Sequence, residues 1–214
     1  MTKTPEKNEL RLASVQWGVY LLLLTPLVYY TKLLFFYTSA KGYFIIGMSE
    51  IVLLLFLWLV YKSPEYLPKL NWVGKIFLVF IAVLLVTSLT GIDPSFSFWA
   101  SVDRITGGLT WIHFGLIFFV VAGVFRTRDD WRRLLTVSTA VALIVAAIHL
   151  LSVVGVDLLP AAAGGSTFGN SSFFGTYLLF HIFFSAYLVL MEHKQSVRIY
   201  GVIAFLILAL TLLL

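Results

Sequence analysis

The stretch that decides the fold is residues 134–156, which read LLTVSTAVALIVAAIHLLSVVGV. It contains no Asp, Glu, Lys or Arg, and Arg132 and Arg133 stand directly before it. A helix needs about 20 mostly apolar residues to cross the hydrocarbon core of a bilayer. Basic residues that flank such a segment usually lie on the cytoplasmic side. The stretch therefore predicts a membrane-spanning helix that enters the bilayer from the cytoplasm.

The composition of the whole chain agrees with this prediction. Of its 214 residues, 60% are hydrophobic and 12% are charged, and the mean hydropathy is +0.98. Soluble domains are about 45–50% apolar and about 25% charged, so an ordinary soluble domain is excluded. The net charge of +5 is assigned to cytoplasmic loops, and no nucleic-acid partner is expected. The chain has no cysteine, which excludes disulfides, thiol nucleophiles and thiolate metal sites. No metal or other cofactor is expected.

Working outward from residues 134–156, comparable apolar windows recur along the chain. The predicted fold class is an all-α polytopic membrane protein with about seven transmembrane helices in a single helical domain. Pro26 lies inside the first window, where we expect it to kink a helix that continues. The windows lie near 15–38, 43–61, 73–91, 105–125, 134–156, 172–191 and 199–214.

Basic residues orient these helices. With the N-terminus in the cytoplasm, the outer segments hold only three of the 15 Lys and Arg residues, namely Lys32, Lys41 and Arg104. This bias follows the positive-inside rule. The last window is still apolar at Leu214, and we expect a chain truncated in that helix. The alternative is a short helix whose terminal carboxylate just reaches the outer interface.

Four ionisable residues lie within the predicted helices, in the outer half or at the midplane of the membrane: Glu50, His113, His149 and His181. Such groups are costly in lipid and usually face a protein interior or a water-filled cavity. One interpretation is a polar cavity that opens outward. The other is a set of buried groups that are each satisfied separately by a backbone carbonyl or a hydroxyl.

The first informative outer loop, residues 91–108, reads GIDPSFSFWASVDRITGG. It opens with a turn at Asp93-Pro94 and continues with an aromatic amphipathic stretch suited to the headgroup region. Arg104 is the only Arg in the predicted outer segments. Its planar guanidinium suits the oxygens of a phosphate or diphosphate, so a lipid phosphate is one candidate ligand. The alternative is an interfacial anchor paired with Asp103.

The second outer loop leads into the sixth predicted helix through Thr167, Gly169, Asn170, Ser171 and Ser172. Asn and Ser at a helix start bond the first free N–H groups of the helix. The same N–H groups attract anions. The loop therefore predicts either a helix cap or a site for a glycan hydroxyl or a phosphate, and capping is the simpler interpretation.

Three segments, one in the first outer loop, one in the basic inner loop and one at the start of the sixth predicted helix, together resemble the O-antigen ligase-like family over about residues 70–214. Their matching residues are Ser97-Phe98-Trp99, Ser101, Arg104 and Gly107-Gly108; Asp130-Trp131-Arg132-Arg133-Leu134-Leu135; and Gly165, Thr167, Gly169, Asn170, Tyr177 and Leu178. In the last of these segments, Gly165 and Thr167 are separated by Ser166, whereas the later positions match the family pattern directly.

The family comprises O-antigen ligases, bacterial protein O-oligosaccharyltransferases and some polymerases. The resemblance implies transfer of a glycan from an undecaprenyl diphosphate carrier to a lipid, protein or glycan acceptor. The reaction would take place on the outer face of the bacterial inner (plasma) membrane, without nucleotide sugar or metal. It implies that Arg104, Thr167, Asn170 and Tyr177 contact the lipid-linked glycan.

In that family, a Ser-Arg-Gly motif and a catalytic outer loop with His and Arg follow the region that corresponds to Leu214. The resemblance therefore implies that the 214 residues are inactive alone, and the catalytic residues are unknown. Two other classes remain open: a fragment of a transporter or flippase, with a site near the bilayer midplane, and a non-catalytic membrane scaffold. Membrane lipids are expected partners in each case.

Overall fold

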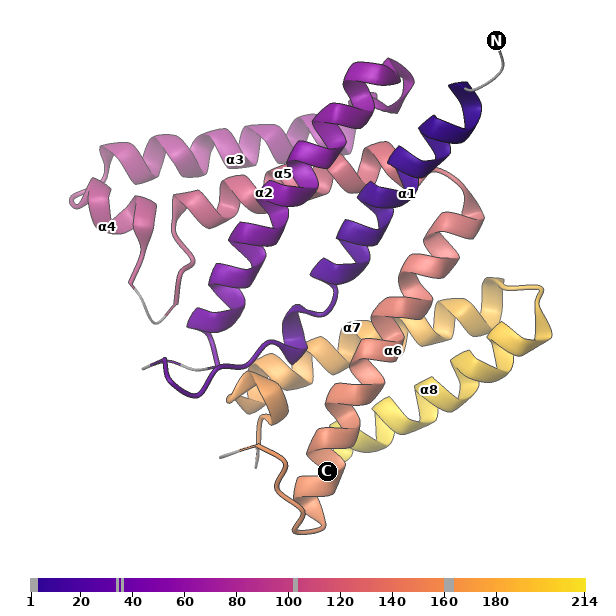
Figure 1. Cartoon of the computed structure of the whole chain (residues 1–214). Helices are drawn as coiled ribbons and strands as arrows, with labels where there is room; N and C mark the ends of the chain where they lie inside the picture. The colour runs from indigo at the N-terminus through magenta and orange to yellow at the C-terminus, as the bar shows by residue number, and fades with distance from the viewer. Residues whose placement is uncertain (1–3, 34, 36, 102–103, 160–163) are drawn as a thin grey trace. The chain divides into compact units, whose positions relative to one another are not determined.

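The computed structural model describes residues 4–33, 35, 37–101, 104–159 and 164–214. Within these residues the chain forms α-helices, short 3-10 helices and turns, and it forms no strand (Figure 1). The all-α prediction is confirmed.

Five of the described helices are long and apolar enough to cross a membrane. A further helix, α5 (Gly108–Val124), is apolar but has only 17 residues. The chain is therefore a polytopic membrane protein, as the sequence predicted. The five helices are α2 (Ser39–Lys62), α3 (Trp72–Thr90), α6 (Arg128–Val153), α7 (Ser171–Met191) and α8 (Gln195–Leu213).

The first predicted span differs from the structure. The sequence predicted a kinked but continuous helix near 15–38, whereas α1 covers Thr4–Leu22 and a 3-10 helix, η1, follows at Thr25–Leu27. Pro26 explains the difference, because a proline ring clashes with the carbonyl four residues earlier, which here belongs to Leu22. The Thr25 hydroxyl instead donates to that carbonyl at 2.5 Å. The prediction of one continuous helix is wrong.

The bounds of other helices are set by local caps. Thr127 and Asp130 form a reciprocal capping box, so α6 begins at Arg128 and includes the basic residues that precede the apolar stretch. The short helix α4 (Pro94–Trp99) starts where Asp93 accepts a hydrogen bond from the N–H of Phe96, with Pro94 in its first turn. This helix forms at the predicted Asp93-Pro94 turn.

The chain divides into two compact units, which are described separately. The first comprises residues 1–25 and 30–126. Here α1 packs against α2, and both α2 and α3 pack against α5. Aromatic rings join α3 to α5, with the centroids of Phe77 and Phe118 4.6 Å apart. Small residues allow close approach of the helices: a Cβ at Gly18 of α1 would meet Val52 of α2 at 2.7 Å.

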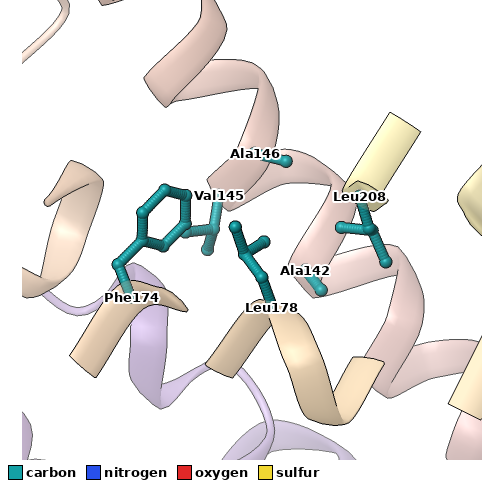
Figure 2. Packing of buried hydrophobic residues seen from close by; sticks show 6 residues of the cluster. All are labelled: Ala142, Val145, Ala146, Phe174, Leu178 and Leu208. Atoms are coloured by element: carbon teal, nitrogen blue, oxygen red, sulfur yellow. The ribbon is translucent and has the colours of Figure 1, made fainter. Parts of the chain in front are cut away.

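The second unit comprises residues 26–29 and 127–214. Helices α7 and α8 form a hairpin and lie side by side, and α6 packs against both (Figure 1). Figure 2 shows Leu178 of α7 directed toward α6, with Leu208 of α8 beside it. The buried apolar cluster of this unit is made of Ala142, Val145, Ala146, Phe174, Leu178 and Leu208.

Candidate functional site

The loop before α7 carries two of the four predicted contact residues, Thr167 and Asn170, and is tightly formed on α6, while Tyr177 lies in α7 itself. Gly165 has no space for a side chain, because a Cβ would overlap the backbone of Gly169 and Asn170. Ser166 adopts a positive φ of 46°, and its hydroxyl donates to the carbonyl of Val145 at 2.8 Å. A positive φ is uncommon for a residue other than glycine. The buried hydrogen bond from Ser166 to α6 therefore helps to hold an otherwise unfavourable backbone conformation.

Asn170 caps α7. Its Oδ1 accepts hydrogen bonds from the N–H groups of Ser172 at 2.9 Å and Phe173 at 3.2 Å. Gly169 precedes it with a left-handed φ of 64°, a conformation that glycine adopts without steric cost. The capping interpretation of this loop is thus confirmed. An anion at this end of α7 would have to compete with Asn170 for the same N–H groups.

Thr167 lies on the inner side of the same loop, and Tyr177 lies in the second turn of α7. Thr167 is only 1% exposed, so its hydroxyl faces the protein interior and not the surface. The ring of Phe168 contacts the half-buried ring of Tyr177, with centroids 4.9 Å apart. Asn170, Ser171 and Ser172 are exposed instead. A ligand that approaches the loop from outside would meet these last three residues first.

Arg104, the fourth predicted residue, is exposed and belongs to the first unit. The following residue, Ile105, is buried and has a φ of 49°, which is a genuine outlier for a β-branched side chain. The Thr110 hydroxyl donates to the Ile105 carbonyl at 2.5 Å, and Gly107 has no space for a Cβ beside Phe98 and Ala100. Arg104 is thus presented by a tightly constrained turn. Asp103, its alternative partner, lies outside the described residues.

The aromatic residues of α4 lie close to this turn in the sequence. Phe96 and Trp99 are exposed, and the ring of Phe98 contacts that of Trp99 edge to face, with centroids 5.1 Å apart. Exposed aromatic rings beside a cationic side chain are typical of a segment at the membrane interface.

Two of the four ionisable residues within the helices, Glu50 and His113, face each other. In the first unit, Glu50 Oε1 lies 3.5 Å from His113 Nε2. In the second, His181 Nδ1 donates to the Tyr177 carbonyl at 2.8 Å, and Nε2 lies 2.9 Å from the Ser138 hydroxyl. His181 is therefore satisfied individually. The buried ring of His149 packs against Phe174 at 5.0 Å.

Sequence reasoning missed the pairing of Glu50 with His113 and of His181 with Ser138. The sequence did show that these polar residues lie at similar depths in the membrane, because each pair joins residues from the interior of two apolar helices. Depth alone does not tell which helices are neighbours. Among the described residues, no group of three or more His, Asp or Glu side chains could hold a metal ion.

Comparisons of the chain with protein-family models, with curated proteins and with solved structures found no match.

Proposed function

We propose that the chain is the N-terminal membrane part of a glycan transferase that binds an undecaprenyl diphosphate-linked glycan. The donor would be bound at the outer face of a bacterial inner membrane, and the acceptor would be a lipid, a protein or another glycan. The main support is the structure of the loop before α7, which is one of the segments that resemble the O-antigen ligase-like family. Its loop is held on α6 by buried Ser166 and leaves Asn170, Ser171 and Ser172 exposed at the start of α7.

A lipid diphosphate requires a cation close to the headgroup region. Arg104 offers an exposed guanidinium on a constrained turn, and α4 beside it in the sequence exposes Phe96 and Trp99. Guanidinium forms paired hydrogen bonds with phosphate oxygens, whereas the ammonium of lysine acts as a point charge. We assign the diphosphate contact to Arg104. The roles of the other predicted residues change accordingly: Thr167 in the loop and Tyr177 in α7 support the loop, while Asn170 and the two serines after it contact the glycan.

Lipid binding by the purified chain in nanodiscs tests this assignment. Undecaprenyl diphosphate is the probe, and undecaprenol, which lacks phosphate, is the control lipid. Because a hydrogen bond to a charged group is worth about 1.5–3 kcal/mol, Arg104→Ala should weaken diphosphate binding about tenfold or more. Arg104→Lys should recover part of the affinity. Arg133→Ala removes another exposed guanidinium and should leave binding unchanged.

Native mass spectrometry of the lipid-loaded nanodiscs gives the bound fraction for each variant. Equal losses in Arg104→Ala and Arg133→Ala would reduce the effect to general charge and remove Arg104 from the proposal. If undecaprenyl diphosphate and undecaprenol bind equally well, the chain does not recognise the diphosphate group, and that part of the proposal is wrong.

One observation favours a second candidate function. Helix α1 ends at Leu22, and a 3-10 helix follows within the apolar window near 15–38. Transporters place their sites at interrupted helices near the bilayer midplane. If the nanodisc experiment excludes diphosphate binding, a transporter or flippase becomes the better proposal, and substrate flux across sealed vesicles is the measurement to make.

A further inference from the structure

A carboxyl group and an imidazole face each other between α2 and α5 in the first unit. Glu50 Oε1 lies 3.5 Å from His113 Nε2, and the Glu50 side chain is 64% exposed while that of His113 is 7% exposed. Glu50 is near the middle of the 24-residue helix α2, about 17 Å from either end at the rise of an α-helix. Ile51, Leu54 and Leu57 on the same helix are also exposed, so the carboxyl group lies among apolar side chains.

The hydrogen bonds of His113 determine what its second nitrogen can do. Nδ1 lies 2.7 Å from the carbonyl oxygen of Leu109, and a carbonyl only accepts hydrogen bonds. Nδ1 therefore carries a hydrogen. In a neutral imidazole the other nitrogen, Nε2, then presents a lone pair. This lone pair faces an oxygen of Glu50, which also accepts hydrogen bonds when it is ionised.

Two acceptors that face each other at this distance repel unless a proton lies between them. An isolated carboxylate in the middle of an apolar segment is costly as well. Both problems are solved by one proton, held either as a carboxylic acid next to a neutral imidazole or as a carboxylate next to an imidazolium. We propose that Glu50 and His113 form an intramembrane proton-binding site.

The proton can move between the two side chains without any other reactant. The O–H bond of the Glu50 carboxyl breaks and leaves its electron pair on oxygen, and the proton forms an N–H bond with His113 Nε2. The reverse step restores the acid. This site does not depend on the proposed glycan transfer.

On α2, the other charged residues lie near the two ends of the helix, and α1 and α3 carry charged residues as well. On α2, Lys41 donates to the Tyr37 carbonyl at 2.9 Å and Lys62 lies over the ring of Tyr61. On α1, Arg11 lies over the ring of Trp58, two turns along α2 from Glu50. Glu9 precedes Arg11 on α1, and Lys75 lies in the first turn of α3. By helix register, the neighbouring titratable group on α2 is Tyr43, two turns from Glu50.

Labelling with dicyclohexylcarbodiimide in liposomes tests the site. This apolar reagent adds to a protonated carboxyl group within the membrane and leaves a stable N-acylurea, which peptide mass spectrometry locates. In His113→Phe the proton has no second acceptor, so the labelled fraction of Glu50 should rise above that of the wild type at the same pH. His113→Gln keeps a polar side chain without a basic nitrogen and should give the same rise.

Another glutamate of the chain and one variant serve as controls. Glu65 lies in the 3-10 helix η2 (Pro64–Tyr66), outside the candidate membrane spans, and should stay unlabelled. Glu50→Gln should abolish the label on this peptide. Gel filtration and circular dichroism verify that each variant is folded.

Two results would overturn the proposal. If Glu50 stays unlabelled in both the wild type and the His113 variants, it is a hydrated carboxylate that holds no proton. If it is labelled equally in all of them, the imidazole does not share the proton.

Discussion

At the scale of single residues, the loop before α7 depends on side chains that are absent or short. Gly165 fits because its Cα lies against the backbone of Gly169 and Asn170. Asn170 fits because a short amide reaches two N–H groups of the following helix. The sequence predicted the cap, since Asn before a helix is a local signal. It did not predict that Thr167 is buried, because burial depends on how the loop lies on α6.

Gly165→Ala should destabilise the second unit. The added methyl group would overlap backbone atoms that cannot rotate away, and such overpacking costs about 1–3 kcal/mol. Gly175→Ala is the matched control within α7, because its Cβ would meet only Leu212, at an ordinary 3.6 Å. There alanine favours the helix. Thermal unfolding in detergent should show a lower midpoint for Gly165→Ala and an unchanged or higher one for Gly175→Ala. The opposite order would contradict the close contact at Gly165.

At the scale of helices, the apolar windows predicted the long helices well because hydrocarbon thickness is a strong constraint on length. The window near 15–38 failed because apolarity does not distinguish a kinked helix from one that ends. At Pro26 both outcomes are compatible with the composition, and the structure ends α1 at Leu22. Pairs between helices, such as Glu50 with His113, could not be predicted without knowing which helices are neighbours.

The contact between α6 and the end of α7 involves one buried acid and two arginines. Glu192, whose side chain is 4% exposed, lies 3.6 Å from Arg128 Nε and 3.7 Å from Arg132 Nη1. Arg132 is largely buried and also pairs with Asp129, whereas Arg128 is half-exposed.

Glu192→Ala should lower the stability of the chain by about 1–3 kcal/mol, because it removes the shared partner of both cations. Arg128→Ala should cost less, since exposed ion pairs contribute only about 0–1 kcal/mol. Chemical unfolding of the two variants in the same detergent measures the difference. If Arg128→Ala cost as much as Glu192→Ala, the buried acid would not be the centre of this contact.

At the scale of the whole molecule, the distribution of basic residues predicts an N-terminus in the cytoplasm. The segments around α4 and before α7, which carry the candidate ligand contacts, would then both face outward. The tight turn that connects α7 to α8 would face the cytoplasm. The proposed function requires this arrangement, because donor and acceptor glycans would meet on the outer side.

Single-cysteine labelling tests this arrangement most directly, since the chain has no cysteine of its own. Ser95→Cys in α4, Ser171→Cys at the start of α7 and Ser196→Cys in the first turn of α8 all replace exposed residues. In intact cells, a membrane-impermeant maleimide should label the first two variants, and it should label Ser196→Cys only after the cells are lysed. Labelling of Ser196→Cys in intact cells, or of only one of the other two, would contradict the orientation on which the proposed function depends.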